Sequence, residues 1–190
     1  MGKAWKIALA GEGGQGVQSV AMILTEAAAL EGKEILYIPN FGVEQRGGVS
    51  IAFVQIGDHK IGSPKFKTGD IVIALSDRAV RRVGVHVGPE TVFIYDAGIE
   101  GIEEDLPKNA QSIIAIPALE TANKELHPRV FNILIMGAVI GATHVVPMEK
   151  AKEAIEKKLG YKFEQNPKLR ELNFKALERG YQMVAGTGVA

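Results

Sequence analysis

The feature that most constrains this chain is a glycine-rich run near its start, GEGGQGV at residues 11–17. The run stands between an apolar segment typical of a strand, residues 5–10, and an apolar segment typical of a helix, residues 17–30. Glycines at a strand-to-helix turn let the backbone bend tightly and bring free N–H groups to the helix N-terminus, where the helix dipole favours an anion. The run therefore predicts an α/β unit with a site for a phosphate-bearing ligand.

The first, third and last glycines of the run also match the G-x-G-x-x-G pattern of dinucleotide-binding turns. A nicotinamide dinucleotide site needs, in addition, an acidic residue at the end of the second strand, which binds the ribose hydroxyls. The second strand is expected at residues 34–38, and Pro-Asn-Phe follows it at residues 39–41. The missing carboxylate disfavours NAD. The residues expected to form the anion site are Gly11, Gly13, Gly14, Gln15 and Gly16.

Apolar runs bounded by turn residues recur along the chain, and several are continuous, as in strands buried on both faces of a parallel sheet. These runs are residues 5–10, 35–38, 49–56, 71–75, 92–95 and 113–116. Helices are expected at residues 17–30, 77–83, 131–142, 147–159 and 167–183. The pattern predicts a single-domain Rossmann-like α/β sandwich with a mostly parallel sheet. A Gly-Asp turn at residues 57–58 also allows an antiparallel hairpin.

Local signals set several of these boundaries. Ser76 or Asp77 is suited to cap the helix that runs to residue 83, and Pro147 and Pro167 stand where first helical turns would begin. We expect residues 1–185 to form one domain and residues 186–190 a frayed tail.

Composition excludes several classes of function. The chain has 190 residues, enough for one domain with a sizeable core, and its 22 basic residues balance its 22 acidic residues. Without a basic block, nucleic-acid binding is not expected. No signal peptide or membrane-length apolar run is present, so we expect a cytoplasmic protein that does not bind membranes. Cysteine is absent, which rules out thiolate-bound zinc and cysteine-ligated iron–sulfur clusters in this chain. The four scattered histidines do not predict a metal site.

A second glycine cluster, FGVEQRGGV, follows the second strand at residues 41–49. Loops that follow parallel strands converge at the carboxyl edge of the sheet, so Arg46 is expected near the glycine run. Its guanidinium suits a phosphate or a carboxylate, and Gly47 and Gly48 leave room for another molecule's backbone. The alternative is that these glycines only form a turn and that Arg46 pairs with Glu44.

Several segments together resemble the gamma subunit of the 2-oxoacid:ferredoxin oxidoreductases, which act on pyruvate, 2-oxoglutarate or ketoisovalerate. They are GEGGQGV at 11–17, FGVEQRGG at 41–48, DIVIAL at 70–75, NILIMG at 132–137 and NFKALERG at 173–180. The QRGG segment is also similar to the beta chain of indolepyruvate ferredoxin oxidoreductase. Gly-Val-Glu stands where that family often has Gly-Pro-Glu, so the 2-oxoacid is left open.

The resemblance implies a subunit that is inactive alone and holds no cofactor by itself. In that family the alpha and beta subunits hold thiamine diphosphate with magnesium, and a ferredoxin-like delta subunit carries the iron–sulfur clusters. The assembly oxidatively decarboxylates a 2-oxoacid, reduces ferredoxin and releases CO2 and an acyl-CoA. The gamma chain is implicated in coenzyme A binding, which the glycine run, Arg46, Gly47 and Gly48 would serve.

Two other interpretations stay open. The chain is a stand-alone nucleotide- or dinucleotide-binding module, or it is a structural chain whose glycines allow close packing against a partner. Arg46 serves either a ligand or a subunit interface, and the subunit stoichiometry is not indicated. No catalytic set is apparent: Asp96 is expected to cap a turn, and Asn132 to cap the helix that it opens.

Overall fold

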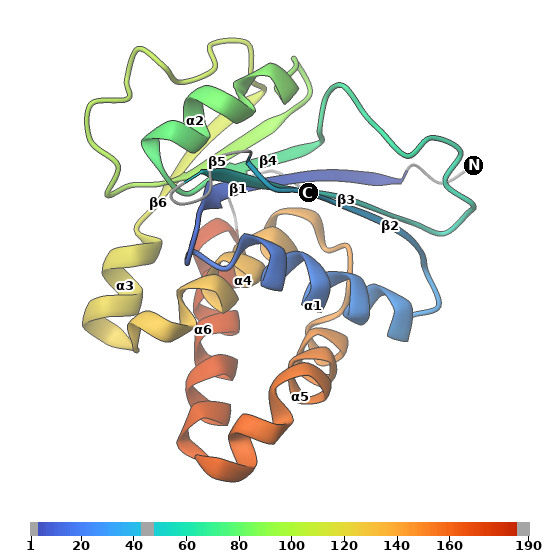
Figure 1. Ribbon diagram of the computed structural model, residues 1–190, viewed down its shortest axis with the longest axis vertical. Helices are drawn as coiled ribbons and strands as arrows, with labels where there is room; N and C mark the ends of the chain where they lie inside the picture. The colour runs from blue at the N-terminus through green and yellow to red at the C-terminus, as the bar shows by residue number, and fades with distance from the viewer. Residues whose placement is uncertain (1–3, 43–47, 186–190) are drawn as a thin grey trace.

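The computed structural model describes residues 4–42 and 48–185 of this chain. In these residues one sheet is flanked by helices on both faces (Figure 1). The strands are β1 (Trp5–Glu12), β2 (Glu34–Asn40), β3 (Val49–Gly57), β4 (Ile71–Ala74), β5 (Val92–Asp96) and β6 (Ser112–Ile116). The α-helices are α1 (Val17–Leu30), α2 (Asp77–Val83), α3 (Ala118–Glu125), α4 (Phe131–Thr143), α5 (Met148–Gln165) and α6 (Lys168–Val184). Short 3-10 turns occupy Gly84–His86 and Pro128–Val130.

The six strands lie in the order β2-β3-β1-β4-β5-β6. Strand β3 is antiparallel to both of its neighbours, and the other neighbouring pairs are parallel. All strands except β3 therefore run in one direction, and their carboxyl ends share one edge of the sheet. The expected α/β sandwich with a mostly parallel sheet is confirmed.

The expected hairpin at residues 57–58 is wrong. Strand β3 ends at Gly57, and the chain from residue 58 to 70 contains no strand. Both edges of β3 are already paired at this end, since Ile56 lies beside Trp5 of β1 and Ile35 of β2. Residues 59–61 therefore have no free edge to join. The antiparallel connection is instead the one between β2 and β3.

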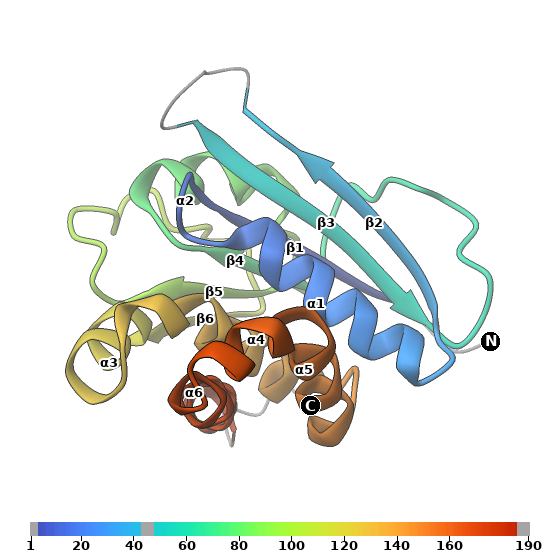
Figure 2. The ribbon, with the colours of Figure 1, turned by 60° about the horizontal axis from the view of Figure 1, so that its bottom comes forward.

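Helix α2 covers one face of the sheet, while α1 and the C-terminal helices cover the other (Figures 1 and 2). The pleat divides β1 between the two sides, because successive side chains of a strand point to opposite faces. Ile7 and Leu9 belong to the larger core beneath α1 and α4, whereas Ala8 and Ala10 belong to the smaller core beneath α2. Helix α4 is buried along nearly its whole length, because it lies between the sheet and α6.

Helices α4 and α6 cross with their backbones in contact. A Cβ atom added at Gly180 would lie 1.9 Å from the backbone oxygen of Leu134, and one added at Gly137 would lie 2.0 Å from that of Leu177. Any side chain at either position would separate the two helices. The glycines of this crossing are therefore required by packing.

Helix α5 is longer than the sequence pattern predicts, whereas α6 agrees with its expected bounds to within one residue. Helix α5 continues past residue 159 to Gln165, because its last turns bury Phe163 in the larger core. Pro147 and Pro167 are the N-cap residues of α5 and α6. Among the described residues, no helix has the length and apolar character required to cross a bilayer.

Candidate functional site

The glycine turn, residues 11–16, joins the end of β1 to the start of α1. Gly14 and Gly16 have φ angles of 93° and 77°, in the left-handed region where side chains other than glycine are strained. Gly16 is also crowded, because a Cβ atom there would lie 2.8 Å from the Cβ of Asn132. A Cβ atom at Gly11 would lie 2.8 Å from both Gln15 and Val17. Backbone shape and packing thus explain three of the four glycines.

Gly13 has neither requirement. Its φ angle lies outside the left-handed region, and a Cβ atom added to it would meet no atom within 4 Å. The residue is exposed and lines a cavity at the turn. The fold would accept a side chain at this position, so neither backbone strain nor packing accounts for the glycine.

Gln15 holds the turn in place. Its Oε1 accepts a hydrogen bond of 2.7 Å from the backbone N–H of Glu12, and its Nε2 donates one of 2.8 Å to the backbone oxygen of Leu75. Leu75 directly follows β4, so the side chain ties the turn to the neighbouring strand. Both the oxygen and the nitrogen of the Gln15 amide are thus used in hydrogen bonds within the chain. Gln15 would therefore contribute to ligand binding by fixing the shape of the turn rather than by contacting the ligand.

The N-terminus of α1 is open to an anion. Its N-cap residue is Gly16, which offers no side-chain cap, and its first turn contains no acidic residue. The first backbone bond of the helix runs from Val20 N–H to the Gly16 oxygen at 3.0 Å. The N–H groups before Val20 have no partner within the helix, and the helix dipole adds partial positive charge beside them. This end of α1 can therefore bind a phosphate or a carboxylate.

A cavity of about 430 Å³, which we call the glycine-turn cavity, lies beside this end of α1. It is lined by Glu12, Gly13, Gly14, Gly16, Val17, Gln18, Ser19, Phe41 and Ser50. The last two residues come from the chain that leaves β2 and from β3. Convergence of this connection on the glycine turn is therefore confirmed for the residues that the structure describes.

Hydrogen bonds and strand pairing fix that convergence. Gln18 of α1 donates from Nε2 to the Ser50 hydroxyl at 2.6 Å and accepts a hydrogen bond from the Tyr37 hydroxyl of β2. Burial raises the pKa of Tyr37, which keeps this hydroxyl protonated as a donor. Gly48 directly precedes Val49, which pairs with Glu12 at the start of the turn. Arg46 and Gly47 lie outside the described residues.

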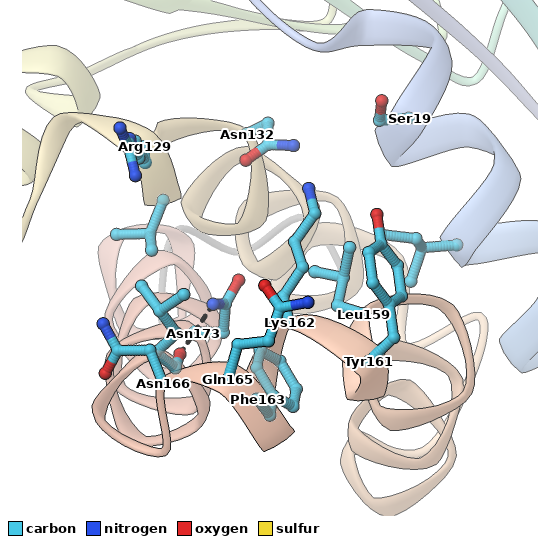
Figure 3. A pocket seen from close by; sticks show the side chains of 13 residues that line it. Ser19, Arg129, Asn132, Leu159, Tyr161, Lys162, Phe163, Gln165, Asn166 and Asn173 are labelled. Carbon is cyan, nitrogen blue, oxygen red and sulfur yellow. Dashed lines mark hydrogen bonds between the residues drawn. The ribbon is translucent and has the colours of Figure 1, made fainter.

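A second cavity, of about 590 Å³, lies between α1, α4, α5 and α6 (Figure 3). We call it the four-helix cavity. It is lined by Ser19, Ile23, Arg129, Val130, Asn132, Leu159, Tyr161, Lys162, Phe163, Gln165, Asn166, Leu169 and Asn173. Ser19 lines both cavities, and Asn132 touches Gly16 from the second one, so the two cavities adjoin. The sequence does not predict this cavity, because its walls come from segments far apart in the chain.

The remaining candidates have structural roles. Asp96 is buried and accepts hydrogen bonds from the backbone N–H groups of Gly98 and Leu119 at 2.9 and 2.8 Å, so its expected capping role is confirmed. The expected capping role of Asn132 is wrong, because the N-cap residue of α4 is Val130. The Asn132 Oδ1 accepts the Ile133 N–H at 3.0 Å instead. No group of three or more acidic or histidine residues suited to a metal ion occurs in the described part of the chain.

The chain matches a family model described as pyruvate ferredoxin/flavodoxin oxidoreductase over residues 6–183. It belongs to this family. The resemblance seen in the glycine motifs is thereby confirmed, and relatives and solved structures named as gamma subunits support it.

Two curated relatives differ in how much of their own length the match covers. The chain is 33% identical to the 2-oxoglutarate synthase subunit KorC of Archaeoglobus fulgidus, covering 93% of this chain and 86% of that protein. It is 31% identical to the ketoisovalerate oxidoreductase subunit VorA of Methanothermobacter thermautotrophicus, covering 92% of this chain but 35% of that protein. In the family, this unit thus occurs both nearly alone and as one part of a longer chain.

Solved structures share the fold. The gamma subunit of keto/oxoacid ferredoxin oxidoreductase from Geobacter sulfurreducens superposes with a TM-score of 0.79 and 27% identity, covering 96% of this chain and 97% of that one. The 2-oxoglutarate:ferredoxin oxidoreductase of Magnetococcus marinus, solved with 2-oxoglutarate, coenzyme A and succinyl-CoA bound, gives a TM-score of 0.85 at 24% identity. The match covers 96% of this chain and 31% of that chain.

Proposed function

We propose that this chain binds coenzyme A as the gamma subunit of a cytoplasmic 2-oxoacid:ferredoxin oxidoreductase. The observation that carries the proposal is the uncapped N-terminus of α1, at a glycine turn that opens on a cavity. Coenzyme A has a diphosphate, which suits free N–H groups at a helix N-terminus. The Magnetococcus marinus relative of the same fold, whose structure contains coenzyme A, supports the choice of ligand.

The residues of the turn divide into two roles in this proposal. Gly11, Gln15 and Gly16 set its shape, and Gly13 and Gly14 present bare backbone to the diphosphate. A side chain at residue 13 would occupy the space of the ligand rather than that of the protein. This explains a glycine that the fold does not require.

Arg46, Gly47 and Gly48 complete the proposed site from the connection between β2 and β3. Arg46 would bond either a phosphate of coenzyme A or a carboxylate on a catalytic subunit. An Arg46→Ala complex should keep its thiamine diphosphate and clusters but lose roughly tenfold to a hundredfold in coenzyme A affinity or turnover. Lysine should restore little, because it lacks the planar fork. Loss of assembly would identify an interface residue, and wild-type kinetics would reject both roles.

The catalytic chemistry belongs to the partners in this proposal. Alpha and beta subunits hold thiamine diphosphate and magnesium, a delta subunit carries iron–sulfur clusters, and ferredoxin accepts the electrons. Residues 1–185 form the gamma-type domain, and no catalytic residue is assigned to it. The relatives' names include 2-oxoglutarate, ketoisovalerate and pyruvate, so the proposal covers the 2-oxoacid class as a whole.

Calorimetric titration of the purified full chain tests the proposal. Coenzyme A should bind and NAD should not, whereas tight NAD binding would favour a stand-alone dinucleotide module. Gly13→Val should weaken coenzyme A binding without unfolding the protein. Gly62→Val is the matched control, because Gly62 is also an exposed loop glycine with open space around it and no left-handed φ. Equal coenzyme A affinity in both variants would place the ligand elsewhere.

A further inference from the structure

The four-helix cavity differs from its surroundings in charge. Most of the basic side chains of α5 and α6 form ion pairs with carboxylates. These pairs include Lys150–Glu153, Lys152–Glu178, Lys157–Glu26, Lys158–Glu26, Arg170–Glu156, Lys175–Glu171 and Arg179–Glu125. Two cations that line the cavity, Arg129 and Lys162, have no carboxylate partner within the described part of the chain. The cavity lining itself contains no acidic residue.

Lys162 is placed to act on a ligand in the cavity. In Figure 3 its side chain extends from α5 toward the end of the cavity at which Asn132 and Ser19 lie. Its ammonium also lies 5.6 Å from the centroid of the Tyr161 ring, another lining residue. The ammonium thus has a neutral aromatic neighbour, which leaves its charge available to an anion.

The lining amides offer both donors and acceptors. Asn173 donates from its Nδ2 to the Leu169 oxygen at 2.7 Å and keeps its Oδ1 as the free end, whereas two other lining amides keep their NH2 groups. Asn132 uses its Oδ1 to accept the Ile133 N–H at 3.0 Å, and Asn166 uses its Oδ1 to accept the Lys168 N–H at 3.2 Å. In both side chains the oxygen is occupied, and the NH2 group remains as the free end. Together with the two unpaired cations, the NH2 groups of Asn132 and Asn166 favour an anionic occupant with several acceptor oxygens.

The position of the four-helix cavity indicates which anion would occupy it. It shares Ser19 with the glycine-turn cavity, where the proposed function places the diphosphate of coenzyme A. In coenzyme A the diphosphate and a 3′-phosphate are attached to the same ribose, so two adjoining anion sites match its two anionic groups. The lining of the glycine-turn cavity includes the acidic residue Glu12, whereas the only charged residues that line the four-helix cavity are the cations Arg129 and Lys162, and this better suits the dianionic monoester.

We infer that the four-helix cavity binds the 3′-phosphate of coenzyme A, with Lys162 and Arg129 as its cationic partners. This inference rests on the proposed function and adds a specificity to it. The chain would distinguish coenzyme A from dephospho-coenzyme A, which lacks only the 3′-phosphate. The site lies on the helices of this chain and does not depend on Arg46.

Titration calorimetry of the full chain with these two ligands tests the inference. The wild-type chain should bind coenzyme A about tenfold or more tightly than dephospho-coenzyme A, because a charge-assisted contact is lost. Lys162→Met and Arg129→Gln should each remove most of this preference while leaving dephospho-coenzyme A binding unchanged. Lys168→Met is the matched control, since Lys168 also lacks a carboxylate partner among the described residues but does not line the cavity. Added salt should reduce the ratio between the affinities for coenzyme A and dephospho-coenzyme A, because salt screens the charges of the 3′-phosphate and its cationic partners.

The outcomes separate this inference from the proposed function. Equal binding of the two ligands by the wild-type chain would overturn the inference and leave the proposed function intact. So would a Lys162→Met variant that keeps the wild-type preference, or one that binds both ligands more weakly by the same factor. Failure of the wild-type chain to bind either ligand would contradict both. Lys162 and Arg129 are exposed, so thermal melts should show that their variants fold normally.

Discussion

Glycine serves opposite purposes in two regions of this molecule. At the crossing of α4 and α6, an added Cβ atom would lie within 2.0 Å of a backbone oxygen, far inside van der Waals contact, so Gly180 and Gly137 are there because no side chain fits. At the turn, Gly13 has open space and an ordinary φ angle, so the fold would accept other residues. The contrast shows that a glycine with room around it is a stronger indication of a ligand than one buried in a helix contact.

The largest effect is expected at the crossing. Gly180→Ala should lower the free energy of unfolding by about 3 kcal/mol or more, because the new methyl group forces two packed helices apart. Gly160→Ala is the control, since Gly160 lies within α5 with no atom near its added Cβ, and it should raise stability by about 0.5 to 1 kcal/mol. Urea denaturation measures both. If the Gly180→Ala variant were as stable as the wild type, packing at the crossing would not require this glycine.

Within the glycine turn, some positions should require glycine for stability and others should not. Gly16→Ala should cost about 1 to 3 kcal/mol, because residue 16 has a left-handed φ angle and faces Asn132. Gly13→Ala should change stability by less than about 0.5 kcal/mol, as expected for an exposed position without strain. The same urea series checks both. If Gly13→Ala destabilised the chain as much as Gly16→Ala, the glycine would be structural after all.

The smallest effect is expected from an ion pair on the surface of the helix layer, between α1 and α5. Hydrogen bonds from Lys157, with Lys158 nearby, hold the pKa of Glu26 below its ordinary value of 4.5. A lowered pKa in the folded state means that the contribution is complete above pH 4.5 and is lost as the pH falls through the folded pKa. Glu26→Gln should therefore cost less than about 1 kcal/mol at pH 7, and less again as the pH drops below 4.5.

Thermal melts of Glu26→Gln and wild type between pH 3 and pH 8 measure this dependence. A difference that grew in acid would show that the sign of the linkage is wrong. A loss as large as that of Gly180→Ala would show that ion pairs, rather than backbone contact, hold the helix layer together.

The features predictable from sequence are those encoded within one short segment. Residues 5–30 specify a strand, a glycine turn and a helix in direct succession, and Ser76 caps α2 by accepting the Ala79 N–H at 3.1 Å, as its residue type indicates. Membership of the family followed from motifs of the same local kind.

Features that depend on distant pairing could not be predicted. The continuous apolar pattern at residues 49–56 indicates a buried strand, but nothing in it says that β3 inserts between β1 and β2 in the opposite direction. Helix α3 has few buried apolar residues to reveal it. Gly160 resembles a helix end, yet α5 continues through it to bury Phe163. Lys162 and Arg129 line one cavity only because segments far apart in the chain pack together.

The Gln15 amide has a consequence for the thermodynamics of ligand capture. Because the Gln15 side chain bonds both Glu12 and Leu75, the turn would already have the shape that the proposed function requires before any ligand arrives. A preorganised site loses less conformational entropy when it is filled, so more of the contact energy remains as affinity. In the proposed function, the same rigidity would keep the backbone N–H groups aligned between successive ligands, and exchange of one bound molecule for the next would require no refolding of the turn.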